Sequence, residues 1–226
     1  MHVQIVLFDG FDPLDAIAPF EVLHAGATAS GGAVGVELVS AEGPREVVSG
    51  TGGLSLRSTG LLDPCRPGVV LVPGASGRLG DPDDGADPGD DGEQQGTVAA
   101  LLARTLDTEL PALLKAAMED ARITVATVCG GALVLAMAGL LQGRHATTHH
   151  LGLGLLDATG VHAVRARVVD DGDLVTAAGV TSGLDLGLYL LEREVGPRIA
   201  HAVEELFAHE RRGTTWRPGG PVPAGF

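Results

Sequence analysis

The chain has 226 residues, a formal net charge of −14, and 45% hydrophobic against 19% charged residues. This composition excludes a largely disordered or fibrous chain and suffices for one α/β domain with its own core. The excess of acids repels phosphate backbones, so we expect no nucleic-acid partner. Only one of the 15 cations, Lys115, is a lysine, which argues against binding to an anionic membrane surface.

In the first half of the chain, β-branched apolar runs alternate with helix-forming stretches. We predict strands at residues 3–8, 36–40, 69–72 and 123–128. Asp12, Pro13 and Asp15 form a helix-start signal, and the helix is expected to run to about residue 25. Residues 47–57 indicate a hairpin at the edge of the sheet. The alternation is typical of βαβ units, so the predicted class is α/β with a mostly parallel sheet.

Two segments bear on where the protein resides. The N-terminus, MHVQIVLFDG, lacks the features of a signal peptide and is predicted to be the first strand, so we expect a cytoplasmic protein. Residues 123–141 are uncharged and about long enough to span a membrane. Their first part is β-branched, and Gly130 and Gly131 separate it from the helix-forming ALVLAMAGLL. A strand, a turn and a buried helix therefore fit better than a span.

The next segment is strongly acidic. Residues 81–93, DPDDGADPGDDGE, contain no cation and few apolar groups, so we predict a mobile insertion over about residues 79–96. Its acids lack the spacing of a calcium-binding EF-hand loop. Residues 97–120 are expected to form two helical pieces, because Pro111 would interrupt one continuous helix.

The last third of the chain carries three more predicted elements and a tail. A hairpin is expected over residues 165–177, turned at Asp171 and Gly172, and a helix over 181–194 with Ser182 and Asp185 at capping-box spacing. A final helix should run from residue 197 to about 210. We therefore expect a single domain over residues 1–212 and a disordered, Pro/Gly-rich tail over 213–226.

Cys129 is the strongest candidate for chemistry. It stands where the apolar strand ITVATV meets two glycines and an apolar helix, which is the arrangement of a nucleophile elbow. A helix N-terminus stabilises a thiolate, so the thiol is predicted to have a lowered pKa. The alternative is a buried, inert cysteine. Cys65, in LDPCRPG, lacks such a context and is interpreted as incidental.

Other residues are expected beside Cys129. The carboxyl ends of parallel strands meet in one crevice, and Asp15 also follows a predicted strand, although it could simply complete a helix cap. An acid near a thiol can donate and recover protons. Gly74 and Ala75 leave another strand at the same edge, so the amides of Ala75 and Gly130 are candidate oxyanion donors.

A cluster of histidines, His145, His149 and His150, suggests a metal site, but no carboxylate or thiol stands at a persuasive spacing, and we predict no metal. We expect His149 to line the crevice; the alternative is a histidine that only makes hydrogen bonds.

Four segments together resemble the ThiJ/PfpI superfamily. They are FDGFDPLDAIAPFEVL, VVLVPGASGR, TVCGGALVLAMAGLLQGRHATTHH and VVDDGDLVTAAGVTSGLDLGLYLLE, and the resemblance covers about residues 3–209. It implies a flavodoxin-like, doubly wound fold with helices on both faces of the sheet, a homodimer, and no cofactor. It also implies that Cys129 is the nucleophile and Asp15 the catalytic acid.

Within the superfamily, the chain is most similar to the isonitrile hydratase branch. That resemblance implies addition of water to a small-molecule isonitrile, giving an N-substituted formamide through a thioimidate on Cys129. Several positions depart from the pattern of the branch: Gly130 replaces the usual Thr, Ala75 a usual Gly, Ala18 a common Gly and His150 a frequent aromatic residue. The peptidase-like branch places His directly after the nucleophile, so Gly130 argues against peptidase activity.

Two alternatives remain open. One is a glyoxalase or redox-stress protein of the same superfamily that uses the same cysteine. The other is a ligand-sensing domain without catalysis, of the kind fused to transcription activators, although we expect no room for a helix-turn-helix module after about residue 210.

Overall fold

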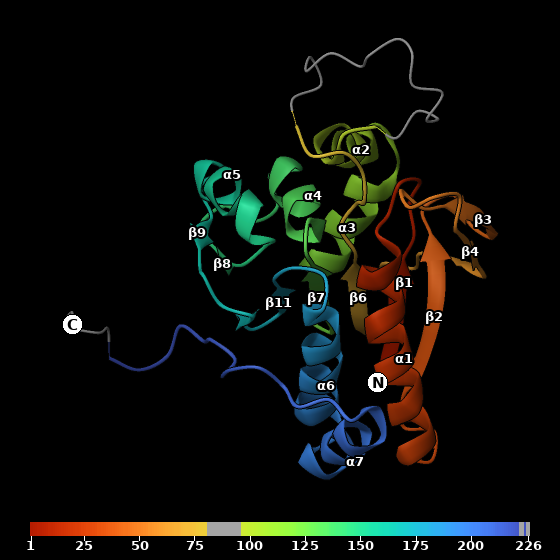
Figure 1. Ribbon diagram of the computed structural model, residues 1–226, viewed down its shortest axis with the longest axis vertical. Coiled ribbons are helices and arrows are strands. Elements are labelled where there is room, and N and C mark those ends of the chain that lie inside the picture. The colour runs from red at the N-terminus through yellow and green to blue at the C-terminus, as the bar shows by residue number, and fades with distance from the viewer. Residues whose placement is uncertain (81–95, 222–223, 225–226) are drawn as a thin grey trace.

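The computed structural model describes residues 1–80, 96–221 and 224, and its centre is a seven-stranded sheet (Figure 1). In spatial order the strands are β10 (Val168–Asp170), β11 (Leu174–Ala177), β7 (Ile123–Val128), β6 (Gly68–Val72), β1 (His2–Val6), β2 (Gly35–Ser40) and β5 (Gly60–Leu61). Neighbours pair in parallel except β10, which runs antiparallel to β11. The order β2-β1-β6-β7-β11 is that of flavodoxin-like sheets. The predicted fold class is confirmed.

The central strands are buried, which explains why they could be found from the sequence. In β1, β6 and β7, almost every residue is shielded from solvent, and most are Val, Ile, Leu or Ala. The register pairs Val3 with Val69 across β1 and β6, and Val72 with Thr127 across β6 and β7. These pairings align the carboxyl ends of the three strands along one edge of the sheet.

The helices form two groups that flank the sheet (Figure 1). One group comprises α1 (Pro13–Ala29), α6 (Ser182–Glu194) and α7 (Pro197–Phe207); the other comprises α2 (Val98–Arg104), α3 (Leu110–Glu119), α4 (Gly131–Met137) and α5 (Leu153–Ala158), with short 3₁₀ turns at Thr105–Asp107 and His150–Gly152. Asp12 caps α1 as predicted, because its carboxylate accepts a hydrogen bond from Leu14 N at 2.9 Å. The helix extends four residues beyond the predicted end.

Several smaller predictions hold with adjustments. The hairpin near residues 47–57 consists of β3 (Arg45–Val48) and β4 (Ser55–Ser58), which form a two-stranded sheet of their own. The segment around Pro111 is divided as expected, but the break comes earlier, because a proline is tolerated in the first turn of a helix and Pro111 occupies that place in α3. A further pair, β8 (His145–Ala146) with β9 (His162–Ala163), escaped the sequence analysis.

The predicted capping box of α6 is wrong. Thr181 is the cap residue, and its side chain makes no capping hydrogen bond. The Asp185 carboxylate instead accepts hydrogen bonds from Arg167 Nε at 2.6 Å and from the Arg212 amide at 2.8 Å. These partners are remote in sequence, so local spacing could not reveal them.

Two segments were predicted to lack a fixed structure, the C-terminal tail and the acidic insertion. The tail was predicted to be disordered, yet at Trp216 its backbone pairs with β10: Trp216 N donates to Val168 O and Asp170 N donates to Trp216 O, each at 2.9 Å. The indole ring also packs on His145, with centroids 5.1 Å apart. The acidic insertion predicted at about 79–96 lies, apart from its ends, outside the described residues.

Across the part of the chain that the structure describes, no helix has both the length and the apolar composition needed to cross a bilayer. The uncharged stretch over residues 123–141 is β7 followed by α4, the strand, turn and helix predicted for it.

Candidate active site

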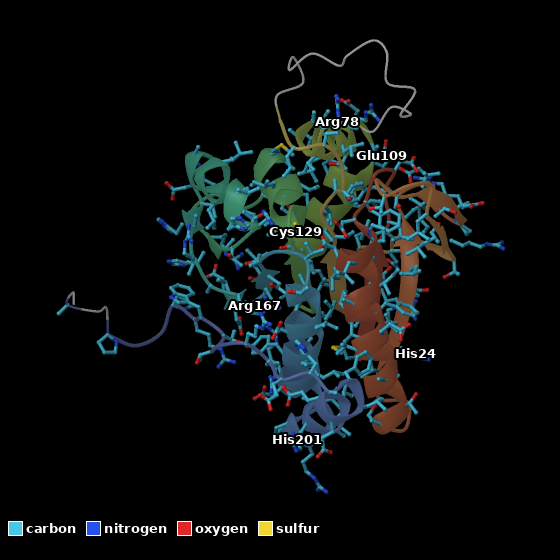
Figure 2. The ribbon with its side chains drawn as sticks, in the orientation of Figure 1. His24, Arg78, Glu109, Cys129, Arg167 and His201 are labelled. Carbon is cyan, nitrogen blue, oxygen red and sulfur yellow. The ribbon has the colours of Figure 1, made fainter. Side chains whose placement is uncertain are left out.

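Cys129 stands at a sharp turn between β7 and α4. Its backbone has a φ of +54°, a left-handed conformation that non-glycine residues rarely adopt. The turn is held by its neighbours: Cys129 N donates to Ala177 O and Ala178 O, both at 3.0 Å, and the Thr148 hydroxyl donates to Cys129 O at 2.7 Å. The elbow predicted from the sequence is therefore present, and Figure 2 shows Cys129 near the middle of the molecule.

Glycines allow three chain segments to meet at this turn. A Cβ atom on Gly131 would lie 2.1 Å from Val72 O, and one on Gly74 would lie 2.6 Å from Gly130 N and 2.8 Å from Asp15 Oδ2. No side chain fits at such distances from backbone atoms. The Gly-Gly pair after Cys129 and the Pro-Gly pair after β6 thus bring the loops that follow β6 and β7 against Asp15.

Asp15 lies in the first turn of α1 and is fully buried. Its Oδ2 accepts a hydrogen bond from Gly74 N at 2.9 Å, and the carboxyl also interacts with the Cys129 thiol. Oδ1 is buried and has no well-formed hydrogen bond to any described residue. Burial, and next the charge of Asp12, raise the pKa of Asp15 well above its ordinary value, and the two hydrogen bonds only partly offset this. A raised pKa favours the protonated carboxyl.

The Cys129 thiol is shifted in the same direction. Burial raises its pKa far above the usual value, the charge of Asp15 raises it further, and the Gly130 N–H acts the other way but weakly. The prediction of a lowered pKa is therefore wrong. Helix α4 has only seven residues, and its dipole does not overcome the removal of the sulfur from water. Both shifts are in the direction of the protonated forms, the carboxylic acid of Asp15 and the thiol of Cys129.

The two predicted oxyanion donors, the amides of Ala75 and Gly130, differ in the hydrogen bonds that they already make. The loop that contains Ala75 runs antiparallel to the loop that contains Phe11. Two hydrogen bonds join the loops on either side of Ala75: Asp12 N donates to Gly74 O at 2.8 Å, and Ser76 N donates to Gly10 O at 3.1 Å. The Ala75 amide is thus left outside the pairing. The Gly130 amide, in contrast, interacts with the sulfur of Cys129 itself.

A cavity of about 400 Å³ opens onto Cys129, Gly130 and Ala75. Its walls are mostly apolar, with Leu102, Leu133, Met137, Leu155 and Val180 among them, while Asp12, Arg78 and His149 contribute polar groups. His149 therefore lines the crevice, and burial, together with the nearby His150, lowers the pKa of its ring. Asp15 does not line this cavity, but its carboxyl interacts with the Cys129 thiol, which does.

Two residues of this arrangement, Thr148 and Leu102, were not among the predicted site residues. Thr148 braces the elbow through its hydroxyl, and Leu102 of α2 packs over Gly130, 3.1 Å from where a Cβ would stand. Both come from segments distant in sequence, and neither belongs to a local pattern. The role of Asp12 was found only in part, because it was predicted as a helix cap and not as part of the cavity wall.

The histidine cluster does not converge. His145 Nδ1 lies 3.2 Å from Asp171 Oδ1, whereas the rings of His149 and His150 pack on each other with centroids 4.2 Å apart. Among the described residues, no group of three or more His, Cys, Asp or Glu side chains is arranged to hold a metal ion.

Comparison with known proteins shows to which family the chain belongs. The sequence model of the DJ-1/PfpI family matches residues 102–193. Isonitrile hydratase of Pseudomonas putida is 33% identical over 207 residues, which cover 90% of this chain and 76% of that protein. The chain belongs to the DJ-1/PfpI family. This family is also called the ThiJ/PfpI superfamily. The resemblance that the four sequence segments indicated is therefore confirmed.

Two further proteins are similar to this chain over most of its length. A ThiJ/PfpI family protein from Pseudomonas syringae superposes with a TM-score of 0.71 at 26% identity, covering 100% of this chain and 78% of that one. The HTH-type transcriptional regulator CdhR of Pseudomonas aeruginosa is 27% identical over 206 residues, covering 89% of this chain but 53% of the regulator. The proteins to which this chain is similar therefore include both an enzyme and a transcriptional regulator.

Proposed function

We propose that this DJ-1/PfpI protein is an isonitrile hydratase that adds water to an isonitrile and releases an N-substituted formamide. The observation that carries the proposal is the buried pair of Asp15 and Cys129: the Asp15 carboxyl interacts with the thiol, the pKa of each group is raised, and Cys129 lines an apolar cavity. The 33% identity to an isonitrile hydratase over 90% of the chain supports it.

The chemistry of an isonitrile demands such a pair. Its terminal carbon is nucleophilic until it is protonated and electrophilic afterwards, so a catalyst must supply a proton and a nucleophile to the same atom. In the first step, the protonated Asp15 carboxyl gives its proton to this carbon, Cys129 Sγ forms a bond to it, and the carboxylate takes up the thiol proton. The product is a thioimidate on Cys129, and Asp15 is again protonated.

In the second step, water adds to the thioimidate carbon. Asp15 passes a proton to the nitrogen and receives one from the attacking water. The carbon–sulfur bond then breaks, the formamide leaves, and the sulfur regains its proton. The Ala75 amide, which has no backbone partner among the described residues, is the candidate donor of a hydrogen bond to the nitrogen of the thioimidate.

The cavity favours a substrate with a neutral, apolar organic group. Leucine, methionine and valine side chains contribute much of its wall, and its two charged side chains, Asp12 and Arg78, are opposite in sign, so the wall has no net charge that would favour an ionic substrate. We therefore expect alkyl or aryl isonitriles to be substrates.

The test is formamide production. Purified protein is incubated with n-pentyl isonitrile, and N-pentylformamide is measured by mass spectrometry; methylglyoxal consumption is followed in parallel. Turnover of the isonitrile that is lost in Cys129→Ala supports the proposal. Consumption of methylglyoxal without formamide would instead indicate the glyoxalase alternative.

The similarity to CdhR across 89% of this chain favours a second candidate, a ligand-sensing domain without catalysis. Its thiol would not need to react, which is compatible with the raised pKa of Cys129. In that case, wild-type protein would turn over neither substrate, and Cys129→Ala would still bind the isonitrile.

A further inference from the structure

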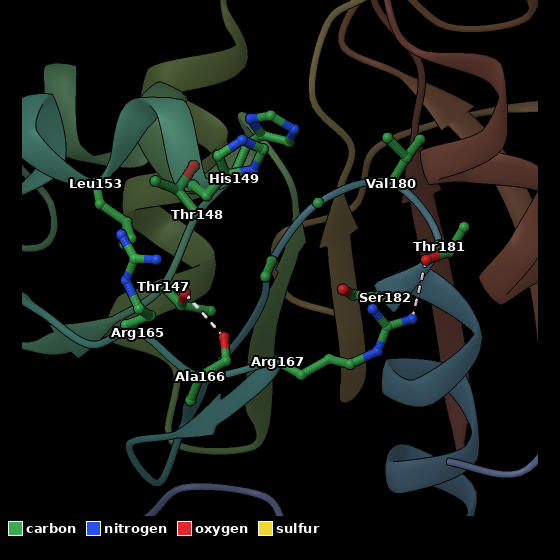
Figure 3. A pocket seen from close by; sticks show the side chains of 13 residues that line it. Thr147, Thr148, His149, Leu153, Arg165, Ala166, Arg167, Val180, Thr181 and Ser182 are labelled. Atoms are coloured by element: carbon green, nitrogen blue, oxygen red, sulfur yellow. Dashed lines mark hydrogen bonds between the residues drawn. The ribbon is translucent and has the colours of Figure 1, made fainter. Parts of the chain in front are cut away.

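A second cavity, of about 470 Å³, lies beside the catalytic one (Figure 3). The two cavities share His149 and Val180 as a common wall, but Cys129 lines only the catalytic one. The second cavity differs in character, because two arginines and several hydroxyl groups line it. Neither the mechanism above nor the sequence motifs make use of it.

Arg167 presents a fixed guanidinium to this cavity. Its Nε donates to Asp185 Oδ2 at 2.6 Å and its Nη2 donates to Thr181 Oγ1 at 3.0 Å, as Figure 3 shows for the second bond. The side chain is 22% exposed, and Nη1 has no hydrogen-bond partner among the described residues. An arginine held in this way keeps one edge of its planar fork available for a ligand.

Arg165 supplies a second cation from the opposite side of the cavity (Figure 3). It is exposed and forms no ion pair with any described residue. The two arginines carry two positive charges against the single carboxylate of Asp185, so the cavity has one positive charge in excess. The chain as a whole has a net charge of −14, so this local excess of positive charge is unusual on its surface.

Ser182 adds an unsatisfied hydroxyl. The residue lines the cavity at the first position of the 13-residue helix α6, is fully buried, and its Oγ has no hydrogen-bond partner in the described structure. Buried polar groups are almost always hydrogen-bonded, so the orphaned hydroxyl points to a missing partner. Because the positive end of the α6 dipole lies here as well, an anion is the partner that fits.

We propose that this cavity binds the carboxylate of a small organic acid, with Arg165, Arg167 and Ser182 as its ligands. One excess positive charge matches a singly charged carboxylate better than a doubly charged phosphate, and a guanidinium edge matches the planar carboxylate. The apolar side chains of Leu153, Ala166 and Val180 leave room for the organic part of the acid. The site is separate from the proposed hydratase centre, and its test does not require turnover.

The experiment is a titration of ¹⁵N-labelled protein, followed by NMR, with benzoate and with its neutral counterpart benzamide. We expect saturable shifts for residues 147–150, 165–167 and 178–182 with benzoate only. Arg165→Gln should weaken benzoate binding by about tenfold or more, and Ser182→Ala by a smaller factor. Arg198→Gln is the matched control, because Arg198 is exposed on α7 and its loss changes the net charge equally. Arg167 is left intact, since its removal would strand the buried Asp185 carboxylate.

Melting curves establish that each variant is folded before the comparison. Equal binding of benzamide, the absence of saturable shifts, or unchanged benzoate affinity in Arg165→Gln would overturn the proposal. Tighter binding of inorganic phosphate than of benzoate, measured in the same titration, would overturn the assignment to a carboxylate.

Discussion

Substitution of Gly74 by alanine tests the packing on which the candidate site depends. The added Cβ would stand 2.6 Å from Gly130 N, 2.8 Å from Asp15 Oδ2 and 3.1 Å from Gly130 Cα. Unstrained contacts between carbon atoms are about 3.5–4.0 Å, so each neighbour would have to move by several tenths of an ångström or more. Two of the three atoms belong to the backbone of the elbow, and the third accepts the hydrogen bond from Gly74 N.

The expected cost follows from these neighbours. Overpacking a buried position costs about 1–3 kcal/mol, and we expect the upper end, about 3 kcal/mol, because a backbone and a buried carboxyl cannot rotate away as a flexible side chain would. For a chain of this length, 1 kcal/mol lowers Tm by about 2–4 °C, so the loss should be about 6–12 °C. Turnover should fall steeply even where the variant is folded, because the shift separates Asp15 from Cys129.

Differential scanning calorimetry and formamide production measure the two effects. Gly154→Ala is the matched control, since a Cβ there meets no atom of the described residues within 4 Å and the residue lies in helix α5, where alanine is favoured over glycine by up to about 1 kcal/mol. It should leave turnover unchanged and Tm unchanged or slightly higher. A Gly74→Ala protein as stable and as active as wild type would refute the packing argument.

Three further predictions concern the same centre. Asp15→Asn should abolish nearly all turnover without lowering the free energy of unfolding at neutral pH. Because the pKa of Asp15 is raised in the folded protein, the wild type loses stability as the pH rises from about 4 through that raised pKa. Urea denaturation across this pH range should show that loss in the wild type and no such loss in Asp15→Asn. Because burial raises the pKa of its thiol, Cys129 should react with iodoacetamide more slowly than the exposed Cys65 at neutral pH, as peptide mass mapping would reveal; faster reaction at Cys129 would contradict the electrostatics described. Thr148→Val should cost about 1 kcal/mol and reduce turnover, since it removes the hydrogen bond to Cys129 O, whereas Thr159→Val removes a comparable hydroxyl–carbonyl bond and should spare turnover; equal effects on turnover would exclude a bracing role.

Much of the fold could be predicted because the information is local. Buried parallel strands are continuous apolar runs, and Asp12 with Pro13 marks the start of α1 within a few residues. The elbow at Cys129 was also found, because a strand, two glycines and an apolar helix follow one another directly in the sequence.

What could not be predicted depends on distant partners. The position of Asp15 beside Cys129 was predicted, but the pKa of Cys129 rises mainly because the sulfur is buried, and the residues that bury it are not visible in residues 127–137. Asp185 has the spacing of a capping residue but is bound by Arg167 and by the backbone of Arg212. Trp216 joins the sheet through β10, although the Pro/Gly-rich sequence around it predicts disorder.

The central claim is covalent catalysis by Cys129 with protons supplied by Asp15. It is tested most directly by quenching the reaction of n-pentyl isonitrile with excess enzyme in its first turnover and mapping the modified peptide by mass spectrometry. We predict a transient adduct of one isonitrile on Cys129 that decays as formamide appears, with none on Cys65 and none in Cys129→Ala. Formamide produced at the wild-type rate by folded Cys129→Ala, with no adduct at any time, would contradict it.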